Sequence, residues 1–380
     1  MKRVALNYIY LSPNHAGGKD QVGLNLLKGF HELGYSKEMY VICFDYSVDT
    51  IKKLAPDVNI IEIKSKKYQT ELARMCNICL VNTFIIPNIV KNYKIELLYH
   101  LSCNTGLRKM NSKTVVIPHD IKAVSHRVLA NVKIPMYKHL LNKLLYYIDF
   151  RNNDYIISIS DVDKKEITQY YPGVSRKIKR LYNPIDIKIE HDNNQRKVGN
   201  YIVALNLQFH HKNIITLIKA FELIKDVTDV NLILIGSVPD RVKYLKEYVL
   251  EHELQERVFF TGFVSDEEKD KLFKECRLYI NPTLYEGFGM TAVEAMIHMI
   301  PTLVSKIDTN YEITKGLCDY YYPPEDEKEL ASKIIECLKK EYSVDELTYA
   351  QKQMFEEYNY LSVSQRYYDF FVKEICDERR

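Results

Sequence analysis

The chain has 380 residues, more than a single hydrophobic core usually serves, so we expect two domains, each with its own core. Its 8 cysteines are scattered, which excludes the disulfide framework of a small secreted domain and favours a reducing compartment. Since no stretch approaches about eighteen consecutive apolar residues, the sequence predicts no membrane-spanning segment.

The net charge of +3 conceals two halves of opposite charge. Residues 1–185 contain 28 Lys and Arg and 15 Asp and Glu, a net charge of +13. Residues 186–380 contain 25 and 35, a net charge of −10. The basic half indicates an anionic partner, such as a membrane or a nucleic acid, or else only a solvated surface.

Apolar runs separated by helical segments fill both halves of the chain. Residues 1–7 read as a first strand rather than a signal peptide, so we expect a cytoplasmic protein. Because strands that alternate with helices form parallel sheets, each half is predicted to be a Rossmann-like α/β domain. The predicted strands are Val4–Leu11, Met39–Phe44, Ile60–Ile63, Thr114–Ile117 and Tyr155–Ile159, then Tyr201–Leu205, Asn231–Ile235, Val258–Thr261, Leu278–Ile280 and Thr302–Val304.

A glycine pair follows the first predicted strand. Gly17 and Gly18 precede a helix that ends near Gly34. Glycines at such a place let the backbone approach a sugar or phosphate held at the helix N-terminus, although most glycine pairs are only turns.

Two patterns have metal-ligand spacing, and for both the sequence favours a structural role. Cys76 and Cys79 form a Cys-x-x-Cys pair without a second pair, which predicts two thiols packed on one helix. Asp161 and Asp163 form an Asp-x-Asp, but Ser160 before them favours a helix N-cap with acids in the first turn. We therefore expect no metal site.

The segment Ile134–Tyr147 combines apolar residues with Lys138 and Lys143. Such a helix is able to dock on an anionic membrane through its basic and apolar side chains. Equally, its leucines are able to form a stripe that faces the core. These leucines are Leu140, Leu141, Leu144 and Leu145.

The boundary between the domains is predicted near Asn183-Pro184, where the dipeptide breaks regular structure and the polar stretch Glu190–Asn200 follows. This places a first domain at residues 1–184 and a second at 185–361. The last segment, from about 362 to 380, carries aromatic residues at helical spacing, namely Tyr367, Tyr368, Phe370 and Phe371.

Residues 281–305 carry the most informative pattern. Glu286 stands at the open end of the predicted strand Leu278–Ile280, a Gly-Phe-Gly turn with an exposed Phe288 follows, and Glu294 falls in the first turn of the next helix. Ligands of open parallel sheets bind at such strand ends, where helix amides face an anion. The alternative is a purely structural role, in which Thr291 and Glu294 form a capping box at the start of the helix.

Glu-Gly-Phe-Gly at 286–289, followed by Glu294, resembles the signature of glycosyltransferase family 4, whose members have the GT-B fold. Three further segments resemble the family in the expected order, namely the glycine loop at 17–18, Pro118-His119-Asp120 and the loop around Lys212. The resemblance implies two Rossmann-like domains facing each other across a cleft. The first would bind the acceptor, the second the donor, and the last helix would cross back to the first domain.

The resemblance also implies roles for single residues. Glu286 would bind hydroxyls of the transferred sugar, and Glu294 the ribose hydroxyls, as ionised carboxylates can. Lys212 would neutralise the departing diphosphate, and His119 would hydrogen-bond a sugar hydroxyl and stabilise charge near the reacting carbon. The remaining substrate-binding residues would be Gly17, Gly18, Gly287, Phe288, Gly289, Met290 and Thr291.

The chain departs from the family at two places. Many relatives have an Arg about five residues before the lysine, where this chain has Asn206, Leu207 and Gln208. Either another cation, such as His210, His211 or Lys19, assists, or the leaving group is stabilised less. Met299 replaces a usual Gly, which is expected to alter a helix end rather than the chemistry.

Together these features predict a retaining, metal-independent glycosyltransferase without a cofactor, which moves a sugar from a nucleotide-sugar to a saccharide or lipid-linked acceptor. We expect it to act in cell-surface polysaccharide or glycoconjugate biosynthesis, at the cytoplasmic face of an anionic membrane, with no nucleic-acid partner. The alternative is a non-catalytic GT-B partner that stabilises an active enzyme, which the missing Arg favours. A phosphorylase or epimerase fits the spacing of the two glutamates less well.

Overall fold

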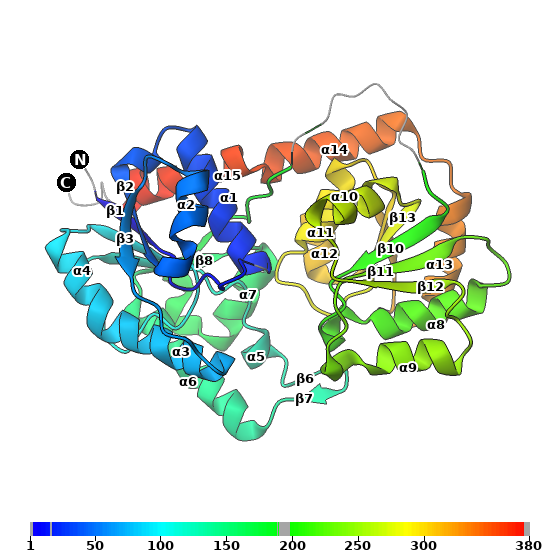
Figure 1. Cartoon of the computed structure of the whole chain (residues 1–380), viewed down its shortest axis with the longest axis horizontal. Coiled ribbons are helices and arrows are strands. Elements are labelled where there is room, and N and C mark those ends of the chain that lie inside the picture. The colour runs from blue at the N-terminus through cyan, green and yellow to red at the C-terminus, as the bar shows by residue number, and fades with distance from the viewer. Residues whose placement is uncertain (1–2, 16, 188, 190–197, 376–380) are drawn as a thin grey trace. The chain divides into compact units, whose positions relative to one another are not determined.

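The computed structural model describes residues 3–15, 17–187, 189 and 198–375, and it divides the chain into two compact units (Figure 1). Unit 1 comprises Met1–Arg127, Ile134–Asp186 and Glu357–Arg380. Unit 2 comprises Val128–Lys133 and Ile187–Glu356. The chain thus leaves unit 1 after Asp186 and returns to it at Glu357.

The core of unit 1 is a sheet of seven parallel strands in the order β3-β2-β1-β4-β5-β8-β9. Strand β1 lies between β2 and β4, where Val4 is in register with both Met39 and Leu97. Strands β1 and β4 in the middle of the sheet are buried on both faces, as expected for a parallel sheet covered by helices, whereas the edge strand β3 is partly exposed. They are β1 (Val4–Asn7), β2 (Met39–Phe44), β3 (Asn59–Ile63), β4 (Leu97–His100), β5 (Lys113–Val116), β8 (Tyr155–Ser158) and β9 (Ile178–Arg180).

Helices cover the sheet of unit 1. Helix α7 begins as its sequence predicts, because the Ser160 hydroxyl accepts a hydrogen bond from the Asp163 amide and Asp161 lies in the first turn, so the N-cap interpretation is confirmed. The α-helices are α1 (Gly18–Glu32), α2 (Val48–Leu54), α3 (Glu71–Leu80), α4 (Ile86–Asn92), α5 (Lys122–Ser125), α6 (Met136–Asn152), α7 (Asp161–Tyr170) and α15 (Tyr360–Asp369), with a π-helix η3 (Val81–Ile85) between α3 and α4 and another, η7 (Phe370–Ile375), after α15.

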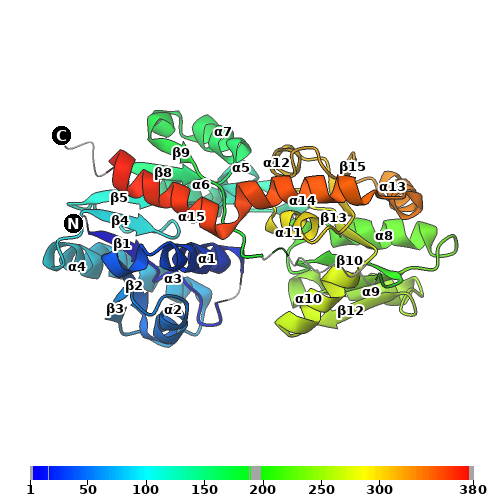
Figure 2. The same ribbon diagram turned by 90° about the horizontal axis from the view of Figure 1, so that it is seen from above.

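The C-terminal segment packs on helix α1 within unit 1, and Figure 2 shows α15 running beside α1. At their contact Gly29 is required, since a Cβ there would lie 2.1 Å from the Ser364 hydroxyl. Phe371 is fully buried and its ring centroid lies 5.4 Å from that of Tyr99. The aromatic residues predicted at helical spacing therefore serve the core of unit 1, whereas residues 376–380 lie outside the described part.

Unit 2 has a sheet of six parallel strands in the order β12-β11-β10-β13-β14-β15. Its strands are β10 (Tyr201–Leu205), β11 (Asn231–Ile235), β12 (Val258–Gly262), β13 (Leu278–Asn281), β14 (Thr302–Ser305) and β15 (Asp319–Tyr321). Its helices are α8 (Ile214–Ile224), α9 (Tyr244–Glu251), α10 (Asp266–Glu275), α11 (Met290–Ile297), α12 (Asp308–Ile313), α13 (Glu327–Lys339) and α14 (Val344–Tyr358). A two-stranded ribbon, β6 (Val128–Leu129) and β7 (Val132–Lys133), is grouped with it.

Three strands of the two sheets are absent from the sequence prediction, namely β4, β9 and β15. Strand β4 is the central strand of the sheet of unit 1, yet its four residues Leu-Leu-Tyr-His are too short to be told from a buried helix by periodicity. Strand β1 is shorter than predicted, because Tyr8–Leu11 leave the ladder while staying buried. Most of the predicted linker Glu190–Asn200 lies outside the described residues.

One helical stretch of unit 1, Glu71–Asn92, is long and apolar enough to cross a membrane by length and composition. Core helices of soluble proteins pass the same test, so this finding does not overturn the prediction of no membrane-spanning segment. One of the two alternatives for helix α6 is wrong. The leucines of α6 do not face the core, because Leu140, Leu141, Leu144 and Leu145 are between 42% and 57% exposed. The helix is anchored instead through its opposite side.

Candidate active site

The loop after strand β10 is held in place by Asn213. This residue adopts a left-handed conformation, with φ of 56°, at the N-cap of helix α8. Its side-chain amide donates to the Pro282 carbonyl at 3.0 Å, beyond the end of strand β13. The loop and the segment after β13 are further joined because the Leu284 amide and the Thr283 hydroxyl both donate to the His211 carbonyl. These contacts fix Lys212 beside the segment that carries Glu286.

Lys212 and Glu286 form an ion pair at the carboxyl ends of the unit 2 strands. The Lys212 Nζ donates to the Glu286 Oε1 at 2.6 Å, and the two side chains are only 15% and 11% exposed. The Asn281 amide lies 3.5 Å from the same oxygen. The structure thus brings together two residues that the sequence places 74 positions apart.

Helix α11 begins differently from the sequence prediction. Its N-cap is Gly289 in the left-handed region, with φ of 89°, and it lacks a side-chain cap, so the capping-box alternative is wrong. Glu294 consequently lies in the second turn of the helix rather than in the first. Because the helix starts at Met290, directly after the loop of Glu286, its N-terminal dipole points toward the same edge of the sheet as the ion pair.

Thr291 and Glu294 lie in the first two turns of helix α11. The Thr291 hydroxyl accepts a hydrogen bond from Tyr279 at 2.7 Å, which ties the first turn to strand β13. Glu294 is partly exposed, and burial raises the pKa of its carboxyl, with Asp270 adding to the effect and Lys269 opposing it. A partly desolvated carboxyl of this kind is suited to bind hydroxyl groups of a ligand.

Phe288 is buried, with 3% of its surface exposed, so the expectation of an exposed side chain is wrong. The Phe288 ring points inward, because the burial of a large apolar side chain lowers the free energy of the folded chain. Only its backbone is therefore suited to contact a ligand. Gly287, Gly289 and Met290 stand beside it in the turn and at the helix start.

Arg241 is a cation near this edge that the sequence analysis missed. It lies in the short helix Asp240–Val242, one strand away from the loop of Lys212, where its Nε donates to the Gln208 carbonyl at 2.6 Å. Its guanidinium also lies over the Phe209 ring, 4.6 Å from the centroid. Its side chain contacts the loop in which many relatives have an Arg and this chain has none. Because 33 residues separate Arg241 from Gln208, only the fold shows that the two are close.

In unit 1, the predicted glycine loop precedes helix α1. Gly17 has φ of 111° and ψ of 157°, a conformation that residues with a Cβ rarely adopt. A Cβ on Gly18 would meet nothing within 4 Å, so the backbone there is open to a ligand. The next residue, Lys19, donates to the Tyr10 carbonyl at 2.8 Å, and burial lowers the pKa of its ammonium. Ala16 lies outside the described residues.

His119 stands after strand β5, in a left-handed conformation with φ of 65°. Its Nε2 lies 2.7 Å from the Leu101 carbonyl oxygen, which can only accept, so Nε2 carries the proton and Nδ1 is left as an acceptor. Burial lowers the pKa of the imidazole to about 4, and the charge of Lys19 contributes in the same direction. His119 is therefore neutral near pH 7 and suited to accept a hydrogen bond from a hydroxyl.

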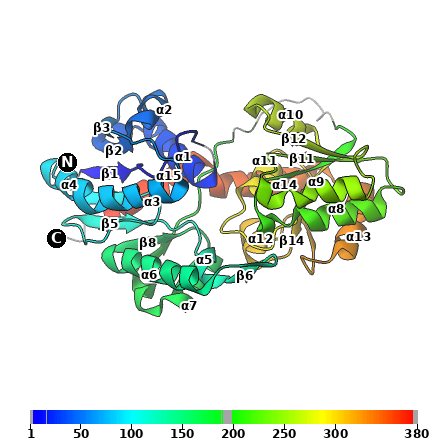
Figure 3. The same ribbon diagram turned by 60° about the horizontal axis from the view of Figure 1, so that its bottom comes forward.

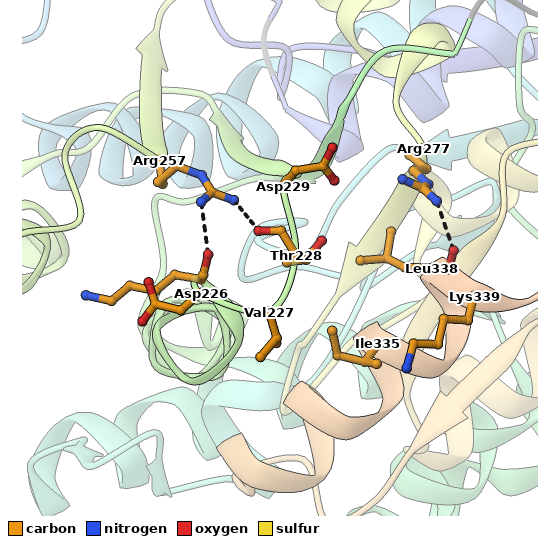
Figure 4. Close-up of a pocket in the computed structure, with 10 residues that line it drawn as sticks. Asp226, Val227, Thr228, Asp229, Arg257, Arg277, Ile335, Leu338 and Lys339 are labelled. Carbon is orange, nitrogen blue, oxygen red and sulfur yellow. Dashed lines mark hydrogen bonds between the residues drawn. The ribbon is translucent and has the colours of Figure 1, made fainter.

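A cavity of about 640 Å³ lies elsewhere in unit 2 (Figure 4). It is lined by residues that precede strands, such as Asp229, Arg257 and Arg277, and thus opens at the amino ends of the sheet. Arg257 is bound to the carbonyls of Lys225 and Thr228, which identifies it as a structural clamp. Because ligands of parallel sheets bind at carboxyl ends, this cavity is not the candidate active site.

Within the described part of the chain, no group of three or more His, Cys, Asp or Glu side chains could hold a metal ion. Cys76 and Cys79 both lie on helix α3, as predicted, but Cys76 is exposed rather than packed.

Residues 186–354 match the model of the family described as "Glycosyl transferases group 1". Most of unit 2 is therefore similar to a group 1 glycosyl transferase domain. The chain is 30% identical over 194 residues to the O-antigen chain mannosyltransferase RfbU of Salmonella typhimurium, covering 50% of this chain and 53% of that protein. It is 29% identical over 182 residues to an uncharacterised glycosyltransferase of Methanocaldococcus jannaschii, covering 44% and 46%. The chain thus spans about half the length of these curated relatives.

The whole chain resembles solved structures in fold. Anabaena HepE, solved in complex with UDP, superposes with a TM-score of 0.71 at 18% identity, covering 98% of this chain and 100% of that one. The group 1 domain and the two parallel sheets flanked by helices show that the chain has the GT-B fold with two Rossmann-like domains, as the resemblance to glycosyltransferase family 4 predicts.

Proposed function

We propose that the chain is a retaining glycosyltransferase that moves a sugar from a nucleotide-sugar donor to a saccharide or lipid-linked acceptor. The ion pair of Lys212 and Glu286 carries this proposal. It puts a cation for a departing phosphate and a carboxylate for sugar hydroxyls 2.6 Å apart, at the strand ends where ligands of such sheets bind.

The donor would lie on unit 2, with its diphosphate at the N-terminus of helix α11. In the unliganded pair the charges of Lys212 and Glu286 cancel, so a diphosphate needs a further cation. Arg241 is suited to supply it, because its side chain is exposed and its hydrogen bond to Gln208 uses Nε rather than the terminal amines. Glu294 would bind the ribose hydroxyls. That HepE was solved with UDP supports a nucleotide as the ligand.

In the proposed reaction, the bond from the anomeric carbon to the phosphate oxygen breaks while the bond to the acceptor oxygen forms on the same face of the sugar. The acceptor hydroxyl gives its proton to the departing phosphate, so atoms and charge balance without a protein base. Lys212 would stabilise the negative charge that develops on that phosphate. Glu286 would hold the sugar hydroxyls, which orients the anomeric carbon.

The acceptor would bind unit 1, where Gly18 leaves the backbone open and the Nδ1 of His119 accepts from a hydroxyl. The positive charges of Lys212, Arg241 and the helix N-terminus support a reaction that needs no metal and no cofactor. The similarity to an O-antigen mannosyltransferase supports a place in cell-surface polysaccharide or glycoconjugate biosynthesis. The scattered cysteines of the sequence favour a reducing compartment, which supports a cytoplasmic location.

The non-catalytic partner is the second candidate, which the missing Arg of the Asn206–Gln208 loop favours. Arg241 weakens that argument, because it brings a guanidinium to the same loop from the short helix after strand β11.

Incubation of the purified chain with nucleotide-sugars and saccharide or lipid-linked acceptors tests the proposal. We expect acceptor-dependent release of nucleotide, and NMR of the anomeric proton should show that the product keeps the configuration of the donor. A chelator should leave the rate unchanged. An inverted product would contradict the retaining reaction, and the absence of turnover with every pair would favour the non-catalytic partner.

A further inference from the structure

Helix α6 of unit 1 is held firmly along one side, next to α5 (Figure 3). Near its start His139 donates from Nδ1 to the Ala123 carbonyl at 3.2 Å, and further along the Tyr146 hydroxyl donates to the Asp120 carbonyl at 3.1 Å. At its end the buried Asp149 carboxylate accepts from the amides of Asn104 and Thr105, both at 2.8 Å. These contacts fix which side of α6 faces away from unit 1.

The opposite side of α6 is apolar and exposed. Tyr137 is 68% exposed, Leu141 51% and Leu144 53%, and these residues recur at spacings of three and four that place them on one helical face. A scattered exposed leucine is normal on a protein surface, whereas a continuous apolar stripe marks an interaction site. We name this stripe the α6 face; its exposed residues are Met136, Tyr137, Leu140, Leu141, Leu144, Leu145 and Tyr147.

A second exposed apolar element is tied to α6 by the loop after β4. The backbone amide of Asn104 donates to Asp149 of α6, and the side-chain amide of Asn104 donates to the Met75 carbonyl of helix α3 at 2.7 Å. In the same loop Leu107 is 59% exposed, and Phe84 of the adjoining π-helix is 55% exposed. The Arg108 guanidinium lies over the Phe84 ring, 5.4 Å from its centroid, so a cation accompanies this apolar surface.

The segment of the chain that carries α6 is strongly basic, with Lys109 paired to Asp154 just beyond it. Residues 101–151 contain nine Lys and Arg but only two Asp and Glu. Of the two acids, Asp149 is buried and bound, and Asp120 accepts from the amide of Lys122. Lys138 is exposed on α6 itself, and Lys143 extends to within 5.7 Å of the Tyr170 ring centroid. Long basic side chains beside apolar ones are typical of helices that lie in a membrane interface.

We propose that the α6 face docks unit 1 on the surface of an anionic lipid bilayer, with the leucines in the interface and the basic residues at the lipid headgroups. A second copy of this chain is a poorer occupant, because pairing two α6 faces would bring two basic surfaces together. The inference does not depend on the transfer reaction, since vesicle binding needs no donor or acceptor.

Co-sedimentation of the full chain with phosphatidylcholine vesicles, with and without phosphatidylglycerol, tests the proposal. We expect binding to the anionic vesicles only, weakened by salt because surface charges are screened. The double variant Leu141→Glu/Leu144→Glu should bind roughly a hundredfold more weakly, since it removes apolar surface and adds two negative charges. Both positions are exposed, so the fold should be retained.

The matched control is Leu223→Glu/Leu250→Glu in unit 2, which makes the same change at leucines that are 53% and 65% exposed. This variant should bind vesicles as the wild type does. The proposal is overturned if the wild type ignores anionic vesicles, or if both double variants lose binding equally. It is also overturned if the wild type is a dimer in solution and Leu141→Glu/Leu144→Glu makes it a monomer without affecting vesicle binding.

Discussion

Replacing Glu286 with Gln is expected to lower kcat by roughly a hundredfold or more, the size of effect seen when a pre-organised polar group of an active site is removed. Gln keeps the shape of the side chain but loses the charge that pairs with Lys212 at 2.6 Å. The Lys212 ammonium is then held less firmly against the departing phosphate, and the sugar hydroxyls lose their acceptor. The measurement is the rate of nucleotide release with donor and acceptor at saturation.

Two comparisons make this result specific. Glu247→Gln alters another Lys–Glu pair of unit 2, that of Lys243 and Glu247 on helix α9, and should leave kcat unchanged. The double variant Lys212→Met/Glu286→Gln should be little worse than either single variant, because residues that act as a unit are not additive. Near-normal turnover by Glu286→Gln with an unchanged melting temperature would refute the assigned role.

Acidification from about pH 7.5 to about pH 5 is expected to remove about 2 kcal/mol of unfolding free energy through each of His100 and His119. Burial lowers the pKa of His100 to about 3 and that of His119 to about 4, from an ordinary value of 6.5. Between pH 6.5 and these values, the two histidines are protonated in the unfolded chain but stay neutral in the native chain. The free energy of unfolding therefore falls as the pH falls. In His100 the ring accepts at Nδ1 from Asn7 and Tyr10, which favours the neutral form.

The variant His119→Asn isolates one of these contributions, since Asn tolerates the left-handed conformation of this position. Burial raises the pKa of the Asp149 and Glu294 carboxyls, which acts in the opposite direction, but this effect cancels when variant and wild type are compared. Urea unfolding at the two pH values should show that the variant loses about 2 kcal/mol less than the wild type. Equal losses would mean that His119 titrates normally in the folded chain.

The fold class and the local motifs are predictable from the sequence because they depend on short-range patterns. Alternating apolar runs identify two parallel sheets, and Ser160 marks the start of helix α7. Strand β4 is missed, since four apolar residues carry no periodicity. The start of helix α11 is misplaced because the capping-box pattern competes with Gly289, whose left-handed backbone the sequence does not reveal.

The composition of the candidate site is predicted better than its geometry. Lys212 and Glu286 are both found by motif, yet their contact depends on Asn213, which binds a carbonyl 69 positions away. Arg241 cannot be found by inspecting the sequence of the Lys212 loop, because it lies in the short helix after the neighbouring strand β11. For α6, the spacing of the leucines would be the same in a buried stripe and in an exposed one. Only the packing of the helix in the fold shows that this stripe is exposed.

A thermal-shift screen of the full chain against UDP, GDP, dTDP and ADP and their sugar conjugates tests the proposed donor site directly. A ligand at about 100 times its dissociation constant adds about 2.7 kcal/mol of stability, which shifts the melting temperature measurably. We expect one nucleotide family to stabilise the chain, the effect to vanish in Glu294→Ala, and the control Glu247→Ala to keep it. No response to any nucleotide, or a full response in Glu294→Ala, would contradict a donor site at helix α11.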